Sequence, residues 1–128
     1  MKDLFLEILN KLEGYKTKCK NLHWAAEKMN THKLLDELLS IISDYQDSIA
    51  EEIMGIRGEH LNPNDIKPIT DNSEDPYQFI KKLTADILSF RKNIPDKVIY
   101  EGMRSECDTF IHNLSKYNYL FSLCDVHS

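Results

Sequence analysis

The sequence predicts an all-α protein whose four helices pack as one bundle. Four stretches of the 128-residue chain repeat apolar side chains at intervals of three and four residues, which is the period of an amphipathic helix. All four prolines fall between these stretches, and no run of residues favours a β-strand. A long connection, 58–76, separates the second stretch from the third, and a bundle joined only by short loops would not need it.

The first two helices are expected at residues 2 to about 29 and from there to about Arg57. The apolar positions of the first are Leu4, Phe5, Ile8, Leu12, Tyr15, Cys19, Leu22 and Ala26. Those of the second are Leu34, Leu35, Leu38, Ile41, Ile42, Tyr45, Ile49, Ile53 and Ile56. Gly14 lies inside the first helix and costs about 1 kcal/mol without ending it. Gly58 is the expected stop of the second helix.

The second half of the chain predicts two more helices. The connection 58–76 holds three prolines and many turn-forming residues, and we expect one short helical turn in it. The third helix has apolar positions Tyr77, Phe79, Ile80, Leu83, Ile87, Leu88 and Phe90. Pro95 separates it from a fourth helix at about 96–124. Two helices, a long crossover and two further helices describe the ferritin-like arrangement, and the length predicts one domain over 1–128.

The composition is mildly acidic, with 16 Lys and Arg against 21 Asp and Glu, a net charge of −5. This balance argues against broad binding to nucleic acids or anionic membranes and is compatible with attracting cations. No apolar run approaches the length of a membrane span, and the N-terminus lacks the apolar core of a signal peptide. Cys19, Cys107 and Cys124 are an odd number with no close pair, typical of reduced thiols in a core. We therefore expect a cytoplasmic protein.

One stripe of the second helix carries potential metal ligands. With His32 at 0° on a helical wheel, Asp36 falls at about 40°, Asp47 at about 60° and Glu51 at about 100°. The apolar positions centre near about 250°, almost opposite. The stripe is either the solvated side of an amphipathic helix or a surface that binds metal. The wheel by itself favours the first interpretation.

A single chain cannot gather this stripe into one metal site. Asp36 and Asp47 are about 16 Å apart along the helix axis, whereas metal–ligand bonds are about 2 Å long. A two-fold axis near residues 40–43 would run two copies of the helix antiparallel. His32 and Asp36 of one copy would then face Asp47 and Glu51 of the other, and the symmetry would make two identical sites.

The residues at the proposed crossing are small. Ser40 and Ser43 lie on the ligand side of the helix between the two halves of the stripe, where they would let two helices approach closely. Leu38, Ile42 and Tyr45 are expected to face the subunit's own core instead.

A turn between the first two helices would bring a second histidine to the stripe. We place this turn at residues 29–31, where Asn30 and Thr31 are helix-capping types. Folding the chain back at residue 30 puts His23 at the level of residue 37, beside Asp36. His23 and His32 would lie on opposite faces of one straight helix, and the hairpin brings them to one site.

The spacing of these residues resembles that of the Dps family (DNA-binding protein from starved cells), a ferritin-like group. The similarity covers residues 21–57: "HW", then H-x3-D, ten residues, then D-x3-E within "DSIAEE". Dps proteins are hollow shells of twelve subunits that oxidise Fe(II), often with peroxide, and store the ferric product. The resemblance implies a di-metal ferroxidase site between two subunits of a dodecamer. Its ligands would be His23, His32 and Asp36 from one subunit and Asp47 and Glu51 from the partner.

The resemblance also implies a role for a neighbouring residue and a choice of metal. Trp24 matches a tryptophan that intercepts oxidising radicals, although a packed aromatic is an equal alternative. Carboxylates with few imidazoles suit Fe(II) and stabilise Fe(III), and Zn(II) would compete for the same groups. Dps relatives carry a basic residue directly after an alanine–glutamate pair, and this chain has Glu52 at that position.

Other features limit the interpretation. The lysine-rich tails by which Dps relatives contact DNA are missing, so DNA binding is not expected. No glutamate has a histidine three residues later, which excludes the usual di-iron motif within one subunit. Asp108 and His112, one turn apart in the fourth helix, are a weaker candidate pair. The alternative function is a non-enzymatic structural or interaction protein that assembles through the stripe-bearing helix.

Overall fold

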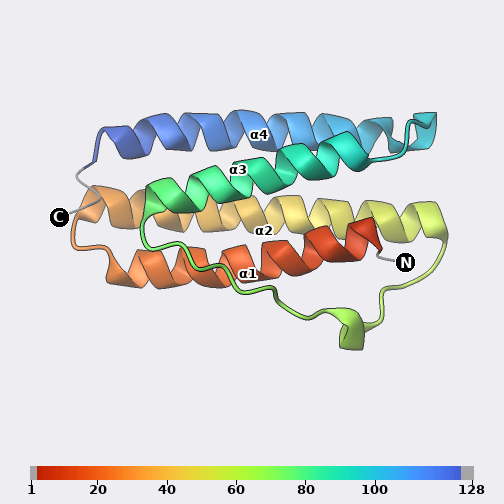
Figure 1. Cartoon of the computed structure of the whole chain (residues 1–128), viewed down its shortest axis with the longest axis horizontal. Helices are drawn as coiled ribbons and strands as arrows, with labels where there is room; N and C mark the ends of the chain where they lie inside the picture. Colours follow the sequence, from red (N-terminus) through yellow and green to blue (C-terminus); the bar gives the residue numbers. More distant parts are fainter. Residues whose placement is uncertain (1–2, 125–128) are drawn as a thin grey trace.

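The computed structural model describes residues 3–124 and contains four α-helices in this range (Figure 1). In chain order the elements are α1 (Leu4–Ala25), α2 (Met29–Arg57), the 3-10 turn η1 (Pro63–Asp65), α3 (Pro76–Asn93), the 3-10 turn η2 (Val98–Tyr100) and α4 (Glu101–Ser122). No strand occurs among the described residues. The prediction of an all-α chain is confirmed.

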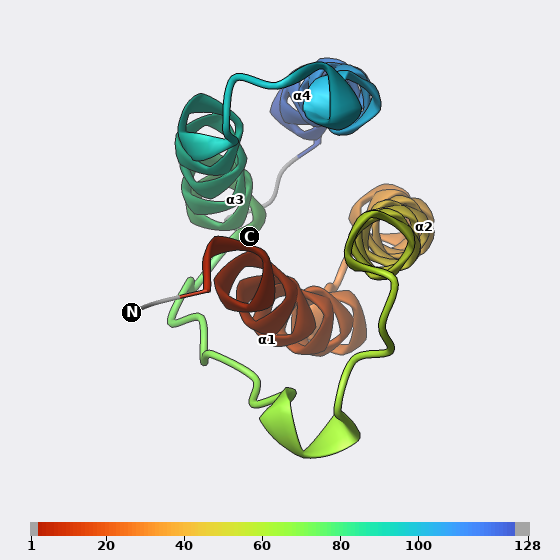
Figure 2. The same ribbon diagram turned by 90° about the vertical axis from the view of Figure 1, so that its right-hand side faces the viewer.

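The four helices form a bundle with one long crossover. α1 and α2 are an antiparallel hairpin, α3 runs in the same direction as α2, and α4 returns antiparallel to α3 (Figure 1). Seen from the end, α1 and α4 occupy diagonal corners, and each lies beside both α2 and α3 (Figure 2). The segment 58–75 carries the chain back along the outside of α1, and it contains the single helical turn predicted for it.

Local sequence signals explain where the helices begin and end. The Asp3 carboxylate accepts hydrogen bonds from the N–H groups of Phe5 and Leu6, and Asp75 caps α3 in the same way. Gly58 adopts φ +67° and donates its N–H to the Met54 carbonyl, so it ends α2 as predicted.

The helices bury most of the apolar faces that the three-four rhythm predicted; Leu88, which is 50% exposed, is an exception. The largest fully buried side chains are Leu12, Leu35, Leu38, Ile42, Ile49, Ile53, Phe79, Leu83, Ile87, Met103, Leu114 and Phe121. Cys19 and Cys107 also belong to this core, and Cys124 is half-buried; all three are free thiols. Burying these apolar surfaces is the main stabilising contribution to the fold.

The crossover is fixed onto α1 by two hydrogen bonds to Asn10. The Asn10 carbonyl accepts from Ile69 N–H (3.0 Å), and the Asn10 side chain accepts from Lys67 N–H (2.9 Å). A Cβ atom at Gly14 would lie 1.7 Å from the Ile69 carbonyl oxygen. Gly14 is therefore the position at which only glycine lets the crossover approach the helix.

Two predicted helix boundaries were wrong. The fourth helix starts at Glu101 instead of about 96, because Arg104 donates to the Ile94 and Pro95 carbonyls and holds 94–100 as a bend with a 3-10 turn. This helix ends at Ser122. The expected helical start at residue 2 lies outside the described residues. The turn between α1 and α2 also differs, as described below.

None of the helices formed by residues 3–124 combines the length and apolar character needed to cross a membrane.

Candidate functional site

His23 and His32 form a reciprocal clasp at the α1–α2 hairpin. Nδ1 of His23 lies 2.9 Å from the His32 carbonyl oxygen, and Nδ1 of His32 lies 2.9 Å from the His23 carbonyl oxygen. The two imidazole rings are stacked, with centroids 3.7 Å apart and planes inclined by 24°. The prediction that the hairpin brings the two histidines together is confirmed.

The clasp determines which nitrogen of each ring can bind another group. A carbonyl oxygen only accepts hydrogen bonds, so each Nδ1 must be the donor. A neutral ring with its proton on Nδ1 carries its lone pair on Nε2, the nitrogen not used in the clasp. This is how metal-binding histidines are usually oriented by their surroundings.

The turn lies about three residues earlier than predicted. α1 ends at Ala25 and α2 begins at Met29, so Asn30 and Thr31 belong to the first turn of α2 instead of the break. The His23 carbonyl is in the last turn of α1, where carbonyls lack intrahelical partners, and the His32 imidazole satisfies it. His23 therefore lies opposite His32, and the prediction that it lies level with residue 37 was wrong.

The faces of α2 are as the helical wheel predicted. Leu38, Ile42 and Tyr45 are buried, whereas the outer side exposes Asp36, Ser40, Asp47 and Glu51 and half-exposes His32 and Ser43. Asp36 lies near the hairpin: the pKa of Cys19 is raised to about 12, first by burial and second by the Asp36 charge. Asp36, Asp47 and Glu51 form no ion pair among the described residues.

Residues 3–124 of one chain do not assemble a complete metal site by themselves. Within residues 3–124, no three side chains of His, Cys, Asp or Glu lie close enough together to hold one ion. Asp108 of the weaker candidate pair, Asp108 and His112, is already in an ion pair. Its carboxylate accepts hydrogen bonds from Arg91 Nε (2.6 Å) and Nη2 (3.2 Å). The proposed site between two subunits stays a prediction that one chain does not test.

Trp24 projects from the hairpin next to His23. It is 69% exposed, and Lys20 Nζ lies over its ring, 5.9 Å from the centroid. The alternative that Trp24 is a packed core aromatic of its own chain is therefore wrong. The role beside a redox site stays a prediction.

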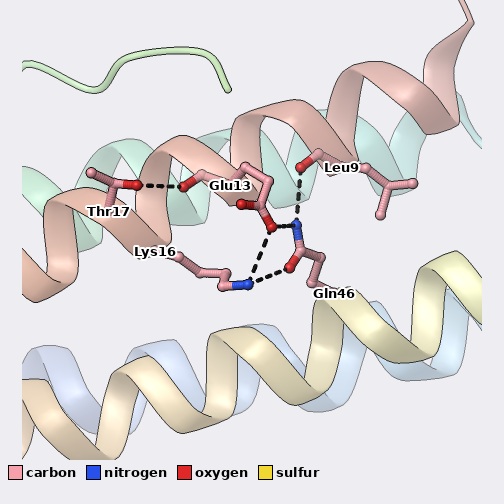
Figure 3. Close-up of polar contacts among 5 residues, drawn as sticks. All are labelled: Leu9, Glu13, Lys16, Thr17 and Gln46. Atoms are coloured by element: carbon pink, nitrogen blue, oxygen red, sulfur yellow. Dashed lines mark hydrogen bonds and ion pairs between the residues drawn. The ribbon is translucent and has the colours of Figure 1, made fainter. Parts of the chain in front are cut away.

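A buried glutamine fixes the register of α1 against α2 (Figure 3). Gln46 Nε2 donates to the Leu9 carbonyl (3.2 Å) and to Glu13 Oε1 (2.7 Å). Lys16 Nζ donates to Gln46 Oε1 (2.9 Å) and to Glu13 (3.2 Å). The sequence signal for this network is a polar residue on the apolar face of α2, and the sequence analysis missed it.

An acid pair between α2 and α4 was also missed. The Glu52 carboxyl group lies beside that of Glu106, and the pKa of Glu52 is raised to about 7, first by burial and then by the neighbouring Glu106 carboxyl group. Glu106 Oε2 is buried and has no hydrogen-bond partner among the described residues. A hollow of about 380 Å³ opens beside it over the stacked rings of Tyr45 and Phe110. The sequence signal for this pair was Glu52, which falls at about 200° on the helical wheel of α2, toward the core.

The fold and this surface define a helical-bundle protein with an acidic outer helix and a histidine clasp. The chain belongs to a family of unknown function (DUF5856), whose sequence profile matches residues 23–121. No curated protein and no solved structure matches the chain.

Proposed function

We propose that this protein is a ferritin-like, Dps-like ferroxidase subunit that oxidises Fe(II) and sequesters the ferric product in a shell. Two copies of α2 would pair about a two-fold axis near Ser40 and Ser43, and further contacts would build a dodecamer. Fe(II) is the substrate, and peroxide or oxygen is the oxidant.

The histidine clasp is the observation that carries this proposal. It holds two imidazoles at one end of the exposed face of α2, with Asp36 one turn further along the same helix. Both Nε2 atoms remain outside the clasp. An iron site needs preoriented donors that the protein does not already use, and these are such donors.

The donor set fits iron chemistry. Asp36, Asp47 and Glu51 supply oxygen ligands that favour Fe(III) over Fe(II), and two imidazoles complete a mixed set. Two Fe(II) ions would supply the two electrons that reduce one peroxide to water. The three carboxylates are exposed and form no ion pair within residues 3–124, so no such pair has to break before they bind metal.

A two-fold contact would supply the ligands that one chain lacks. The His23–His32–Asp36 end of one α2 would face the Asp47–Glu51 end of the other. Ser40 is exposed between the two ends and is small enough for a close crossing. Each pair of subunits would contain two identical sites.

A structural function is the second candidate, and the clasp also favours it. The two histidines already have a task, because they close the hairpin by satisfying each other's carbonyls. In this alternative the bundle assembles through α2 without redox chemistry.

Anaerobic titration with Fe(II), followed by peroxide, separates the two candidates. The ferroxidase should bind about two Fe(II) ions at each site between two subunits. It should consume one peroxide for every two Fe(II), without releasing hydroxyl radicals. Asp36→Ala should abolish the binding. Protein that oxidises Fe(II) no faster than buffer does would exclude the ferroxidase and leave the structural function.

A further inference from the structure

The hollow between α2 and α4 has the size of a small-molecule site. Its volume of about 380 Å³ lies within the range of about 300–1,000 Å³ that is typical of ligand pockets. Facing turns of the two helices line it, including Ile41, Tyr45 and Ser48 of α2 and Glu106, Thr109 and Phe110 of α4. These α2 positions fall between about 120° and 220° on the helical wheel, away from the stripe of proposed metal ligands.

The floor of the hollow is apolar and already in place. Tyr45 and Phe110 are buried, and their rings are stacked with centroids 4.1 Å apart and planes inclined by 11°. The Tyr45 hydroxyl lies 3.1 Å from the Cys107 thiol in a hydrogen bond, so this polar atom already has a partner. The ring of Tyr45, with Phe110 and Ile41, therefore offers a ligand apolar surface that needs no rearrangement.

The charged residues that line the hollow are both acidic. They are Asp44 and Glu106, and neither forms an ion pair within residues 3–124. Glu106 Oε2 is buried and has no hydrogen-bond partner among the described residues, and Glu52 lies beside this carboxyl group as a further acid. A buried carboxyl oxygen without a donor costs free energy, which a cationic N–H donor would recover.

This combination excludes two simpler kinds of ligand. An anion would meet Asp44 and Glu106 with no basic residue among those that line the hollow in the described part of the chain. A bare metal ion needs several ligands around one point, and no group of three His, Cys, Asp or Glu side chains within residues 3–124 provides them. A metal ion would also leave the aromatic floor unused.

We propose that the hollow binds a small organic ammonium compound, a protonated amine attached to a compact apolar body. The ammonium group would lie at the acidic wall of Asp44 and Glu106, and the body would cover the rings of Tyr45 and Phe110. Carboxylates and aromatic rings both attract an organic cation, and the apolar body adds the free energy of surface burial. This site is separate from the proposed ferroxidase site and does not depend on it.

The probe for the test is 2-phenylethylammonium, and calorimetry of the full chain at about 150 mM salt measures its binding. We expect saturable binding of one probe per chain. The neutral 2-phenylethanol and the anionic 3-phenylpropionate should bind weaker by about tenfold or more, because they lack the cation. Ethylammonium, which lacks the ring, should also bind weaker by about tenfold or more. Absence of saturable binding, or equal binding of the neutral alcohol or of ethylammonium, would overturn the proposal.

Two charge variants separate the acidic wall from the general acidity of the chain. Glu106→Gln keeps the shape of the side chain and should weaken probe binding by about tenfold. Glu37→Gln removes the same charge from an exposed position of α2 outside the hollow, and it should bind as the parent does. Equal affinities of these two variants would contradict a role for the wall.

Filling the hollow tests its position. Ser48→Leu places a larger apolar side chain in the space and should abolish probe binding, while circular dichroism shows whether the helices remain. Thr109→Leu fills the hollow from α4 at an exposed position and gives the same test if Ser48→Leu does not fold. Parent-like binding by a folded filling variant would show that the probe binds elsewhere and would overturn the assignment.

Discussion

The carboxyl group of Glu52 on α2 lies beside that of Glu106 on α4, and burial together with this neighbour raises the pKa of Glu52 to about 7. The pair lies beside the Tyr45 hydroxyl, which is 3.1 Å from the Cys107 thiol and whose pKa is raised by burial and by these neighbours. Glu52 therefore keeps its proton to a higher pH than an exposed glutamic acid does.

This pair should make stability depend on pH. Glu52 has an ordinary pKa of 4.5 and a folded pKa of about 7, so between these values the folded chain keeps a proton that the unfolded chain has released. The contribution to the unfolding free energy is complete below pH 4.5 and is lost as pH rises through 7. Glu106→Gln should flatten this dependence and stabilise the protein at pH 8 by about 1 kcal/mol. Urea unfolding at pH 5 and pH 8 measures both effects.

Asp44→Asn is the control for the acid pair, because Asp44 is an exposed acid of α2 that forms no ion pair in the part of the chain that the structure describes. It should leave the difference between pH 5 and pH 8 as in the parent. A Glu106→Gln protein with the parent's pH dependence would show that the pair does not hold the proton.

The two tasks of His23 can be separated by two amide substitutions. The Asn side chain places its nitrogen where histidine has Nδ1, and the Gln side chain places its nitrogen nearer the position of Nε2. His23→Asn should keep the hydrogen bond to the His32 carbonyl and most of the stability, but it should lose Fe(II) oxidation. His23→Ala should lose both this hydrogen bond and the oxidation, and it should cost about 1 kcal/mol of unfolding free energy for the one net hydrogen bond that its side chain donates.

Unfolding by urea and the initial rate of Fe(II) oxidation measure these two effects on the same samples. His23→Gln controls for the presence of an amide, since it should be destabilised by the loss of the clasp. Full oxidation by His23→Asn would remove His23 from the proposed site and leave it only in the hairpin.

Activity should be partly restored when two inactive variants are mixed. In a two-fold pair of Asp36→Ala and Glu51→Ala subunits, one site lacks both ligands and the other is intact. Random pairing of equal amounts gives about a quarter of the parent's sites, and we expect about a quarter of its Fe(II) oxidation rate. The rate after unfolding and refolding the mixture tests this.

Subunit exchange must be shown independently, for example by mass spectrometry of one isotope-labelled variant. Mixed pairs that are as inactive as the two parents would contradict a site shared between subunits.

Gly14→Ala should destabilise the protein although alanine is the better helix former. The new Cβ would lie 1.7 Å from the Ile69 carbonyl oxygen, so the crossover must move away from α1. We expect a loss of about 1–3 kcal/mol, as is usual for overpacking. Gly55→Ala is the matched control, because nothing lies within 4 Å of its Cβ position, and it should stabilise by about 0.5–1 kcal/mol. Thermal unfolding of the two variants should shift in opposite directions.

The sequence by itself determined the helices and their buried faces. The three-four rhythm identified Leu38, Ile42 and Tyr45 as core residues and Asp36, Asp47 and Glu51 as exposed ones, because helical periodicity follows from backbone geometry alone. Gly58 ended α2 as predicted, since a left-handed residue at that position is a local requirement. The long connection 58–76 likewise indicated a crossover before any contact was known.

Only the tertiary structure decided the relationships between elements. The turn between α1 and α2 lies at 26–28 because His23 and His32 satisfy each other's carbonyls. The capping preferences of Asn30 and Thr31 could not predict this pairing. The need for glycine at position 14 depends on where the crossover passes. The raised pKa of Glu52 beside Glu106 depends on how α2 packs against α4. These features arise from contacts between residues far apart in the chain, and local periodicity carries no information about such distances.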